Sequence, residues 1–173
     1  QVIIDRRAGR LIENEEAQSL CDTLNSSISL KDPDASVIII PTIAHRVTIR
    51  FRHKKIALSN QITNTDPAYD KVDGMGIAKT DISEMKVLKS IPQDNNVSST
   101  ISSDLVNDFS SQVYLISKNH AVNKSREKRN LNAMNSILLR DAGTIIPNYV
   151  PIEQKYKMKV ACVVDMPVEI GIS

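Results

Sequence analysis

Residues 46–52 alternate strictly between apolar side chains and side chains that carry charge or a hydroxyl group. The apolar positions are Val47, Ile49 and Phe51, and the polar positions are Arg46, Thr48, Arg50 and Arg52. Successive side chains of a strand point to opposite faces, so this pattern predicts a strand with one face on a core and one in water. Two short apolar runs beside it, residues 37–40 and 56–58, are predicted to be strands as well.

Two longer segments repeat their apolar residues at helical spacing. The first begins near Asn14, which we expect to be the N-cap, and Glu15 and Glu16 suit the first turn of a helix. Its apolar positions are Ala17, Leu20, Cys21 and Leu24. The second covers about residues 99–118, with Ile101, Leu105, Phe109, Val113 and Ile116 on one face.

The rest of the chain predicts short elements. Strands are expected at residues 2–4, 86–91, 136–139 and 160–164, an irregular segment at 64–76, a charged turn at 124–129 and a polar helical turn at 152–157. Strands and helices alternate, with hairpin-like neighbours in the middle. We therefore predict an α/β (α+β) domain over residues 1–173, in which helices cover a mixed β-sheet.

Composition excludes several classes of protein. No apolar run approaches the roughly 20 residues of a membrane span, so we expect no membrane partner. The net charge is only +2 and aromatic residues make up 3%, which does not favour a nucleic-acid partner. Cys21 and Cys162 lie far apart in apolar patterns, and we expect both to be reduced core residues.

The set of catalytic groups is small. The three histidines, His45, His53 and His120, lack the spacing of metal ligands. The chain also lacks a P-loop, a GxSxG elbow and a paired-cysteine zinc pattern. A self-contained hydrolase or metalloenzyme is therefore not predicted, and no metal site is expected in this chain.

Arginines gather at the ends of the predicted strands. These are Arg6, Arg7, Arg10, Arg46 and Arg140. A guanidinium group offers a planar fork of donors that matches carboxylate and phosphate oxygens, so a small dianionic ligand is the expected guest. The alternatives stay open: the charges from Arg50 to Lys55 suit a solvated face, Asp5 suits a local ion pair, and His120 suits a helix cap.

Several segments together resemble the archaeal-type, cofactor-independent phosphoglycerate mutases of the alkaline phosphatase superfamily. The similar segments occur in the family's order and are VIIDRRAGR (2–10), TNTDP (63–67), KNHAVNK (118–124), NSILLRDAG (135–143) and EQKYK (153–157) followed by Ala161 and Cys162. The resemblance implies a glycolytic and gluconeogenic isomerase of the cytoplasm, which interconverts 3-phosphoglycerate and 2-phosphoglycerate through a phosphoserine intermediate.

The same resemblance implies that this chain is one part of a longer enzyme. It is similar to the substrate-binding lid domain that is inserted into a phosphatase-like domain, and that other domain holds the nucleophilic serine and two divalent metals of the Mn, Mg, Zn or Co class. The chain also starts at Gln1 within a predicted strand, so we expect a fragment that is inactive alone.

The family resemblance also suggests site residues. Asp5 is the candidate for handling a hydroxyl proton of glycerate. The candidates for substrate binding are Arg6, Arg7, Arg10, Arg46 (beside His45), His120, Asn123 and Arg140. Two positions depart from the family pattern: Ile170 stands where a lysine is typical, and Ala121 follows His120 in place of proline. Two alternatives remain, the lid of another phosphomutase of this superfamily and a non-catalytic module that binds anions or RNA.

Overall fold

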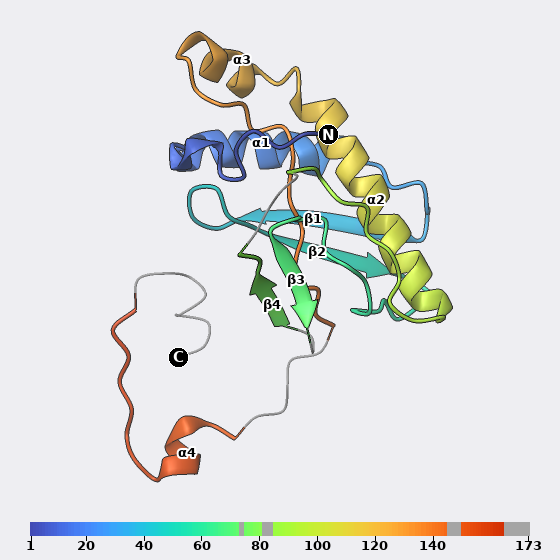
Figure 1. Cartoon of the computed structure of the whole chain (residues 1–173), viewed down its shortest axis with the longest axis vertical. Coiled ribbons are helices and arrows are strands. Elements are labelled where there is room, and N and C mark those ends of the chain that lie inside the picture. The colour runs from blue at the N-terminus through green and yellow to red at the C-terminus, as the bar shows by residue number, and fades with distance from the viewer. Residues whose placement is uncertain (73–74, 81–84, 145–149, 165–173) are drawn as a thin grey trace.

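The computed structural model describes residues 1–72, 75–80, 85–144 and 150–164, and the elements named below lie within these ranges. After a 3₁₀ turn at Ala8–Arg10 the order is α1 (Asn14–Ser27), β1 (Ala35–Pro41), β2 (Val47–His53), β3 (Tyr69–Val72), β4 (Met75–Ala78), α2 (Val97–Ser117), α3 (Ala121–Lys128) and α4 (Ile152–Tyr156). Figure 1 shows α1 along the β1–β2 hairpin, with α2 running past both.

The β1–β2 hairpin confirms the alternation that the sequence predicts. The two strands pair antiparallel, with Val37 opposite Phe51 and Ile39 opposite Ile49. The apolar side chains of β2 pack against the core, whereas Thr48, Arg50 and Arg52 are exposed. The hairpin therefore has one covered face and one open face.

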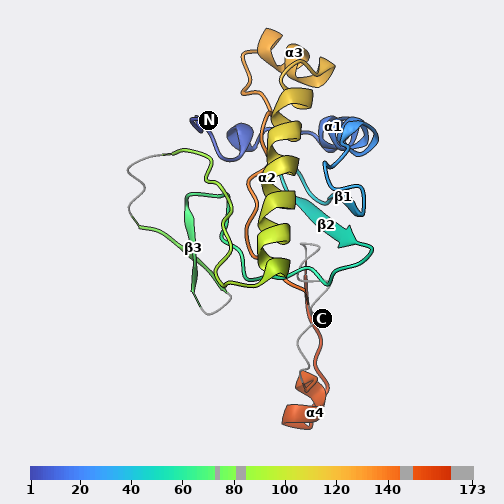
Figure 2. The same cartoon turned by 90° about the vertical axis from the view of Figure 1, so that its right-hand side faces the viewer.

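The core lies between this hairpin and the two long helices. Its buried members are Leu20, Cys21 and Leu24 from α1, Ile39 from β1, and Phe109 and Val113 from α2. The ring of Phe109 meets the ring of Phe51 edge-on, with 5.5 Å between centroids. Figure 2 shows α2 in front of the two strands, which is the position from which its apolar face reaches them. The two predicted helices thus form, at almost the predicted bounds.

The start of α1 differs from the prediction by one residue. Glu13, not Asn14, is the N-cap, because the Glu13 and Glu16 side chains bind each other's backbone N–H groups in a capping box. Asn14 instead uses its side-chain oxygen to accept a hydrogen bond from the Ala44 N–H, at 3.2 Å. This contact ties the β1–β2 turn to the beginning of α1.

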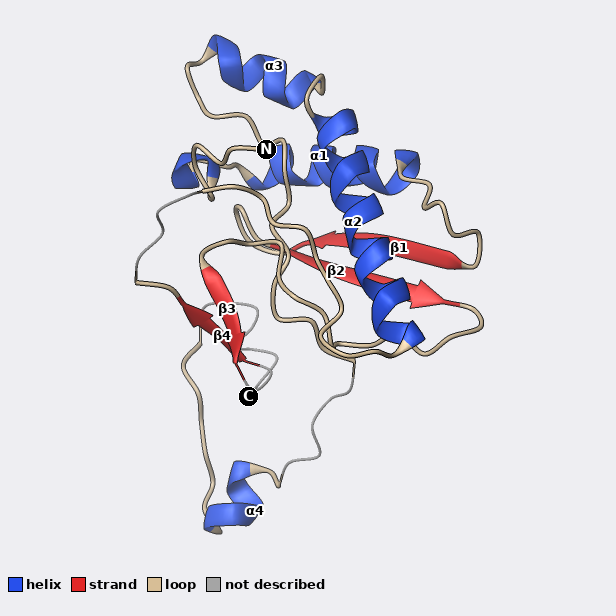
Figure 3. Cartoon of the chain, turned by 45° about the vertical axis from the view of Figure 1, so that its right-hand side comes forward, coloured by secondary structure: helices blue, strands red, loops and turns tan. Residues whose placement is uncertain are grey.

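The class α+β is confirmed, but the sheet is organised differently from the prediction. In the described residues the strands form two separate antiparallel pairs, β1–β2 and β3–β4, instead of one mixed sheet. The β3–β4 hairpin begins within the segment 64–76, which was expected to be irregular, and this expectation was wrong from Tyr69 onward. Figure 3 shows the two pairs as distinct red ribbons.

Several short apolar runs do not form strands within the described residues. Residues 2–4 and 86–91 meet in one isolated bridge, between Val2 and Lys86, and residues 56–58 form none. Residues 136–139 are extended, and Ile137 and Leu139 pack on the core without a ladder. Residues 160–164 are exposed and unpaired. These runs have strand composition but no neighbouring strand edge, which a ladder requires.

Helix bounds and burial decide the predictions for the two turns and the two cysteines. Residues 124–128 of the expected charged turn belong to α3, and the predicted helical turn at 152–157 forms as α4. Cys21 is buried, and burial raises the pKa of its thiol to about 11. Cys162 is exposed, so the prediction of a second core cysteine was wrong. Among the described residues, no helix combines the length and the hydropathy needed to cross a membrane.

We expect Phe109→Ala to lower the free energy of unfolding by about 3–5 kcal/mol, because it leaves a cavity beside Phe51 and Leu24. Urea unfolding followed by circular dichroism measures this loss. Leu115→Ala on the same helix is the control, since Leu115 is 61% exposed and its truncation should cost less than about 0.5 kcal/mol. Equal losses for both variants would contradict the core described above.

Candidate functional site

The loop after residue 4 is folded around the carboxylate of Asp5. Its oxygens accept hydrogen bonds from the backbone N–H groups of Arg7, at 2.7 Å, and Gly9, at 2.9 Å. These bonds, the one from Arg7 first, hold the pKa of Asp5 below its usual value. Ala8, Gly9 and Arg10 then follow with φ of 45°, 74° and 58°. Only glycine adopts such angles freely, so the loop is strained at two of these three residues and must be held from outside.

Arg126 of α3 holds this loop from inside the protein. Its guanidinium group is fully buried and donates to the backbone carbonyls of Ala8, at 3.2 Å, Leu11, at 2.9 Å, and Asn132, at 2.8 Å. It also donates to Glu16 Oε2 at 2.5 Å. Sequence reasoning missed Arg126, because it lies in a run of charged residues that is typical of a solvated turn.

Glu16 completes this internal network from the first turn of α1. One carboxylate oxygen binds Arg126, and the other accepts a hydrogen bond from Arg129. Burial raises the pKa of Glu16, but the hydrogen bonds from Arg129, the Glu13 N–H and Arg126 outweigh that effect, and its pKa is lowered overall. The carboxylate is therefore ionised at neutral pH and balances the buried guanidinium group.

The first of two cationic groups in the site, called here the Arg7–Arg46 group, joins this loop to the β1–β2 turn. It consists of Arg7, His45 and Arg46, with Asp5 beside them. Burial lowers the pKa of His45, and the charges of Arg46 and Arg7 lower it further, so the imidazole is neutral at pH 7. Among the described residues, its buried Nδ1 atom has no hydrogen-bond partner.

The second cationic group, called here the Arg6–Arg140 group, surrounds Tyr69 at the start of β3. Arg6 forms a two-point ion pair with Asp66, and its Nε lies 3.0 Å from Asp66 Oδ1. The guanidinium carbons of Arg140 and Arg6 lie 3.9 Å and 5.2 Å from the centroid of the Tyr69 ring. Burial raises the pKa of Tyr69, but Arg140 and Arg6 lower it more, and its pKa is lowered overall.

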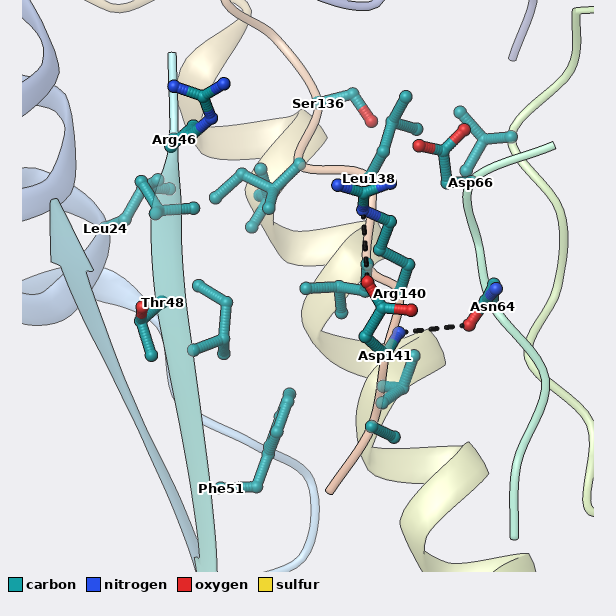
Figure 4. A pocket seen from close by; sticks show the side chains of 18 of the residues that line it. Leu24, Arg46, Thr48, Phe51, Asn64, Asp66, Ser136, Leu138, Arg140 and Asp141 are labelled. Atoms are coloured by element: carbon teal, nitrogen blue, oxygen red, sulfur yellow. Dashed lines mark hydrogen bonds and ion pairs between the residues drawn. The ribbon is translucent and has the colours of Figure 1, made fainter. Parts of the chain in front are cut away.

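Asp141 sets the position of Arg140 from the next residue along the chain. Its carboxylate lies 3.3 Å from Arg140 Nε, and its N–H donates to Asn64 Oδ1 at 3.3 Å. Figure 4 shows both contacts as dashed lines. Asp141 has a φ of 58°, and its carboxylate lies against Gly76 of β4 so closely that any Cβ there would collide with it. The β3–β4 hairpin thus abuts the acid that neutralises Arg140.

Both groups line one broad cavity of about 1700 Å³. Of the residues that the sequence indicates, the cavity brings together Asp5, Arg6, Arg7, Arg46 and Arg140. Arg46 lies on the β2 side of this cavity, whereas Arg140, Asp141, Asn64 and Asp66 lie on the other side (Figure 4). Arg10 lines a smaller hollow next to it, together with Asp5, Arg6 and Arg7.

His120 and Asn123 do not line this cavity, and the structure gives both a structural role. His120 is the N-cap of α3, where its Nδ1 accepts a hydrogen bond from the Val122 N–H, and its Nε2 lies 3.0 Å from Thr23 Oγ1. Asn123 is fully buried and exchanges two hydrogen bonds with the backbone of Met134. The capping alternative for His120 is confirmed, and the predicted substrate contacts of both residues stay predictions.

The two departures from the family pattern that the sequence indicates are Ala121 and Ile170. Ala121 begins α3 directly after the His120 cap, so replacing proline there leaves a regular helix start. Ile170 lies outside the described residues. Within residues 1–72, 75–80, 85–144 and 150–164, no three His, Cys, Asp or Glu side chains gather as a metal site. The two metals that the family resemblance implies belong to the other domain, and they stay a prediction.

Comparison with known proteins identifies the family. A family model described as 2,3-bisphosphoglycerate-independent phosphoglycerate mutase matches residues 1–123. The chain belongs to this family. It is 34% identical over 172 residues to the 2,3-bisphosphoglycerate-independent phosphoglycerate mutase of Aeropyrum pernix and 30% identical to that of Methanosphaera stadtmanae, each over 99% of this chain.

Structure comparison agrees with this assignment. The cofactor-independent phosphoglycerate mutase from Thermoplasma acidophilum superposes with a TM-score of 0.65 and 28% identity, over 99% of this chain. The chain spans 40% of the Aeropyrum mutase, 37% of the Methanosphaera mutase and 40% of the Thermoplasma chain. The chain therefore spans about two fifths of the length of these mutases.

We expect Arg126→Met to lower the free energy of unfolding by about 3–5 kcal/mol, because three carbonyls and Glu16 lose their buried donor. Urea unfolding measures this loss. Lys124→Met on the exposed side of α3 serves as the matched control and should stay within about 0.5 kcal/mol of the unmodified protein. A loss below about 1 kcal/mol for Arg126→Met would show that the loop is held by other contacts.

Proposed function

We propose that residues 1–173 form the inserted substrate-binding lid domain of a cofactor-independent phosphoglycerate mutase. Family membership supports this, and so does the length of the chain, which is two fifths of its relatives. The single observation that carries the proposal is the cavity itself, which Arg6, Arg7, Arg46 and Arg140 all line.

The division of the cavity into two cationic groups suits a ligand with two anionic ends. A phosphoglycerate carries a carboxylate at one end and a phosphate as an ester of a hydroxyl group. Guanidinium forks bind both kinds of oxygen pairs, and they do so better than lysine because their donors are planar and fixed. Arg46 and Arg140 lie on opposite sides of the cavity (Figure 4), and we propose that one ligand engages both groups.

In the proposed reaction the phosphoryl group passes from 3-phosphoglycerate to a serine of the phosphatase-like domain and returns to the other hydroxyl, which gives 2-phosphoglycerate. This chemistry depends mainly on positioning and charge neutralisation. The contribution of this chain is to hold glycerate between the two steps and to keep it from leaving. Two divalent metals of the Mn, Mg, Zn or Co class, bound in the other domain, would stabilise charge on the transferred group.

Asp5 has a narrower part in this scheme than a free carboxylate would have. We propose that it accepts a hydrogen bond from a glycerate hydroxyl and so orients that group. Its lowered pKa makes it a weak base, and its oxygens already shape the Arg7 loop. In the ground state the hydroxyl group therefore keeps its proton and donates it in a hydrogen bond to Asp5.

The wider assignment follows from the same proposal. The intact protein would be an isomerase of glycolysis and gluconeogenesis in the cytoplasm, with phosphoglycerates and its own phosphatase-like domain as partners, and with neither membrane nor nucleic acid among them. An RNA-binding module is the second candidate, because Arg50 and Arg52 are exposed on the open face of β2. RNA binding by that face would weaken steeply as salt rises.

We expect the isolated chain to show no mutase or phosphatase turnover with added Mn²⁺ or Mg²⁺, because no nucleophile and metal set is predicted in it. The intact protein should convert 3-phosphoglycerate to 2-phosphoglycerate in an enolase-coupled assay. In the intact protein, Arg7→Ala should reduce kcat/KM about 100-fold or more, which is the usual effect of losing one preorganised charge contact.

The control for Arg7→Ala is Lys124→Ala, which removes an equal charge from the exposed side of α3. Its kinetics should match those of the unmodified enzyme. Turnover by the isolated chain, or full activity of Arg7→Ala, would count against the proposal. Salt-sensitive RNA binding without mutase activity in the intact protein would favour the second candidate.

A further inference from the structure

Tyr69 is the point at which three distant segments of the chain meet. Arg6 comes from the N-terminal segment, Arg140 follows the extended residues 136–139, and Tyr69 itself begins β3. Both guanidinium groups are in contact with the same aromatic ring, at 3.9 Å for Arg140 and 5.2 Å for Arg6. The ring also lines the large cavity. Tyr69 was not among the residues that the sequence singled out.

Two guanidinium groups that contact one ring repel each other, and other groups must offset that repulsion. Asp66 offsets part of it by holding Arg6 at two points, and Asp141 offsets part by pairing with Arg140 Nε. Neither carboxylate contacts both arginines through a described ion pair. The face of an aromatic ring attracts cations, and arginine stacks on it especially well. The Tyr69 ring is therefore the shared element that allows both cations to occupy one wall.

The backbone of Tyr69 is itself fixed, which makes the ring a firm support. Its carbonyl oxygen accepts a hydrogen bond from Asn64 Nδ2 at 3.2 Å. Tyr69 is also paired with Ala78 in the β3–β4 hairpin. The Asn64 side chain also accepts a hydrogen bond from the Asp141 N–H. One asparagine thus ties the Tyr69 backbone to the residue next to Arg140.

We propose that Tyr69 is a positioning residue for the ligand, whose ring sets the spacing of Arg6 and Arg140 so that both donate to one oxyanion. The identity of the ligand in this proposal rests on the proposed function. The new part is that Tyr69 organises the Arg6–Arg140 group. The ring acts through the arginines. Arg140 lies over the ring, 3.9 Å from its centroid, and both arginines also act on the hydroxyl group, whose pKa they lower.

The test uses the intact enzyme with 3-phosphoglycerate. Tyr69→Leu removes the aromatic face, and we expect kcat/KM to fall about tenfold, mainly through KM, because the arginines lose their common support. Tyr69→Phe keeps the ring and removes only the hydroxyl group on which both arginines also act, so its loss should be clearly smaller than that of Tyr69→Leu. Tyr156→Leu is the control, since Tyr156 has its own cation contact, with Lys155 on α4, and does not line the cavity.

A double-mutant cycle separates positioning from general loss of structure. In an Arg140→Ala background, Tyr69→Leu should cost threefold or less, because the ring then supports only Arg6. The same tenfold loss in both backgrounds would overturn the proposal, and so would wild-type kinetics for Tyr69→Leu. A fall for Tyr69→Phe as large as that for Tyr69→Leu would also overturn it, by assigning the effect to the hydroxyl group.

Calorimetry can measure the affinity of the intact protein for inorganic phosphate without relying on mutase activity. This second measurement tests the role of Tyr69 separately from the proposed function. If the intact protein lacks mutase activity while Tyr69→Leu still weakens phosphate binding about tenfold, the proposed function fails and the positioning role of Tyr69 stands. If the enzyme is active and neither KM nor phosphate affinity changes in Tyr69→Leu, the positioning role fails and the proposed function stands.

Discussion

The buried guanidinium group of Arg126 is the interaction on which the site depends. It lies where α1, α3 and the Asp5–Leu11 loop meet, and it satisfies three carbonyls that no regular element pairs. A buried cation is costly to bring out of water, and Glu16 offsets that cost from the first turn of α1. With this ion pair in place, the loop accepts strained angles at Ala8 and Arg10 and presents Arg7 to the cavity.

In the cavity, too, arginines are paired with acids that offset their charge. Two of the arginines on the cavity wall pair with an acid, Arg6 with Asp66 and Arg140 with Asp141, and the His45 beside Arg46 is neutral and adds no further positive charge. The positive potential is therefore local, which agrees with a net charge of only +2 for the whole chain. Such a surface suits the small anion that we propose as its ligand better than an extended polyanion, which needs a broad basic face.

Periodicity could predict the parts of the fold that bury one face. The alternation in β2 and the helical spacing of Leu20, Leu24, Leu105 and Phe109 are physical requirements of packing, so the hairpin and both long helices were predictable. Strand composition alone was a weaker guide, as residues 136–139 and 160–164 illustrate, since a ladder also needs an edge to pair with. The β3–β4 hairpin was missed because its residues carry no alternating pattern.

The candidate site was predictable in its exposed arginines and unpredictable in what supports them. Clusters such as Arg6 and Arg7 stand out beside an apolar run. Arg126, Glu16 and Tyr69 do not, because their importance lies in partners 60 or more residues away, such as Leu11 for Arg126. No local pattern encodes such a contact. The sequence thus indicates the exposed arginines, and the structure adds the contacts that hold them in place.

Gly76 illustrates how a residue outside the cavity affects a side chain that lines it, that of Asp141. It lies on an exposed hairpin, where sequence drift is usually tolerated, yet its missing side chain is what leaves room for the Asp141 carboxylate. Any larger residue there would push aside the acid that neutralises Arg140, and the cavity wall would become more positive. A side chain at position 76 would therefore alter the charge of the cavity from outside it, although Gly76 itself does not line the cavity.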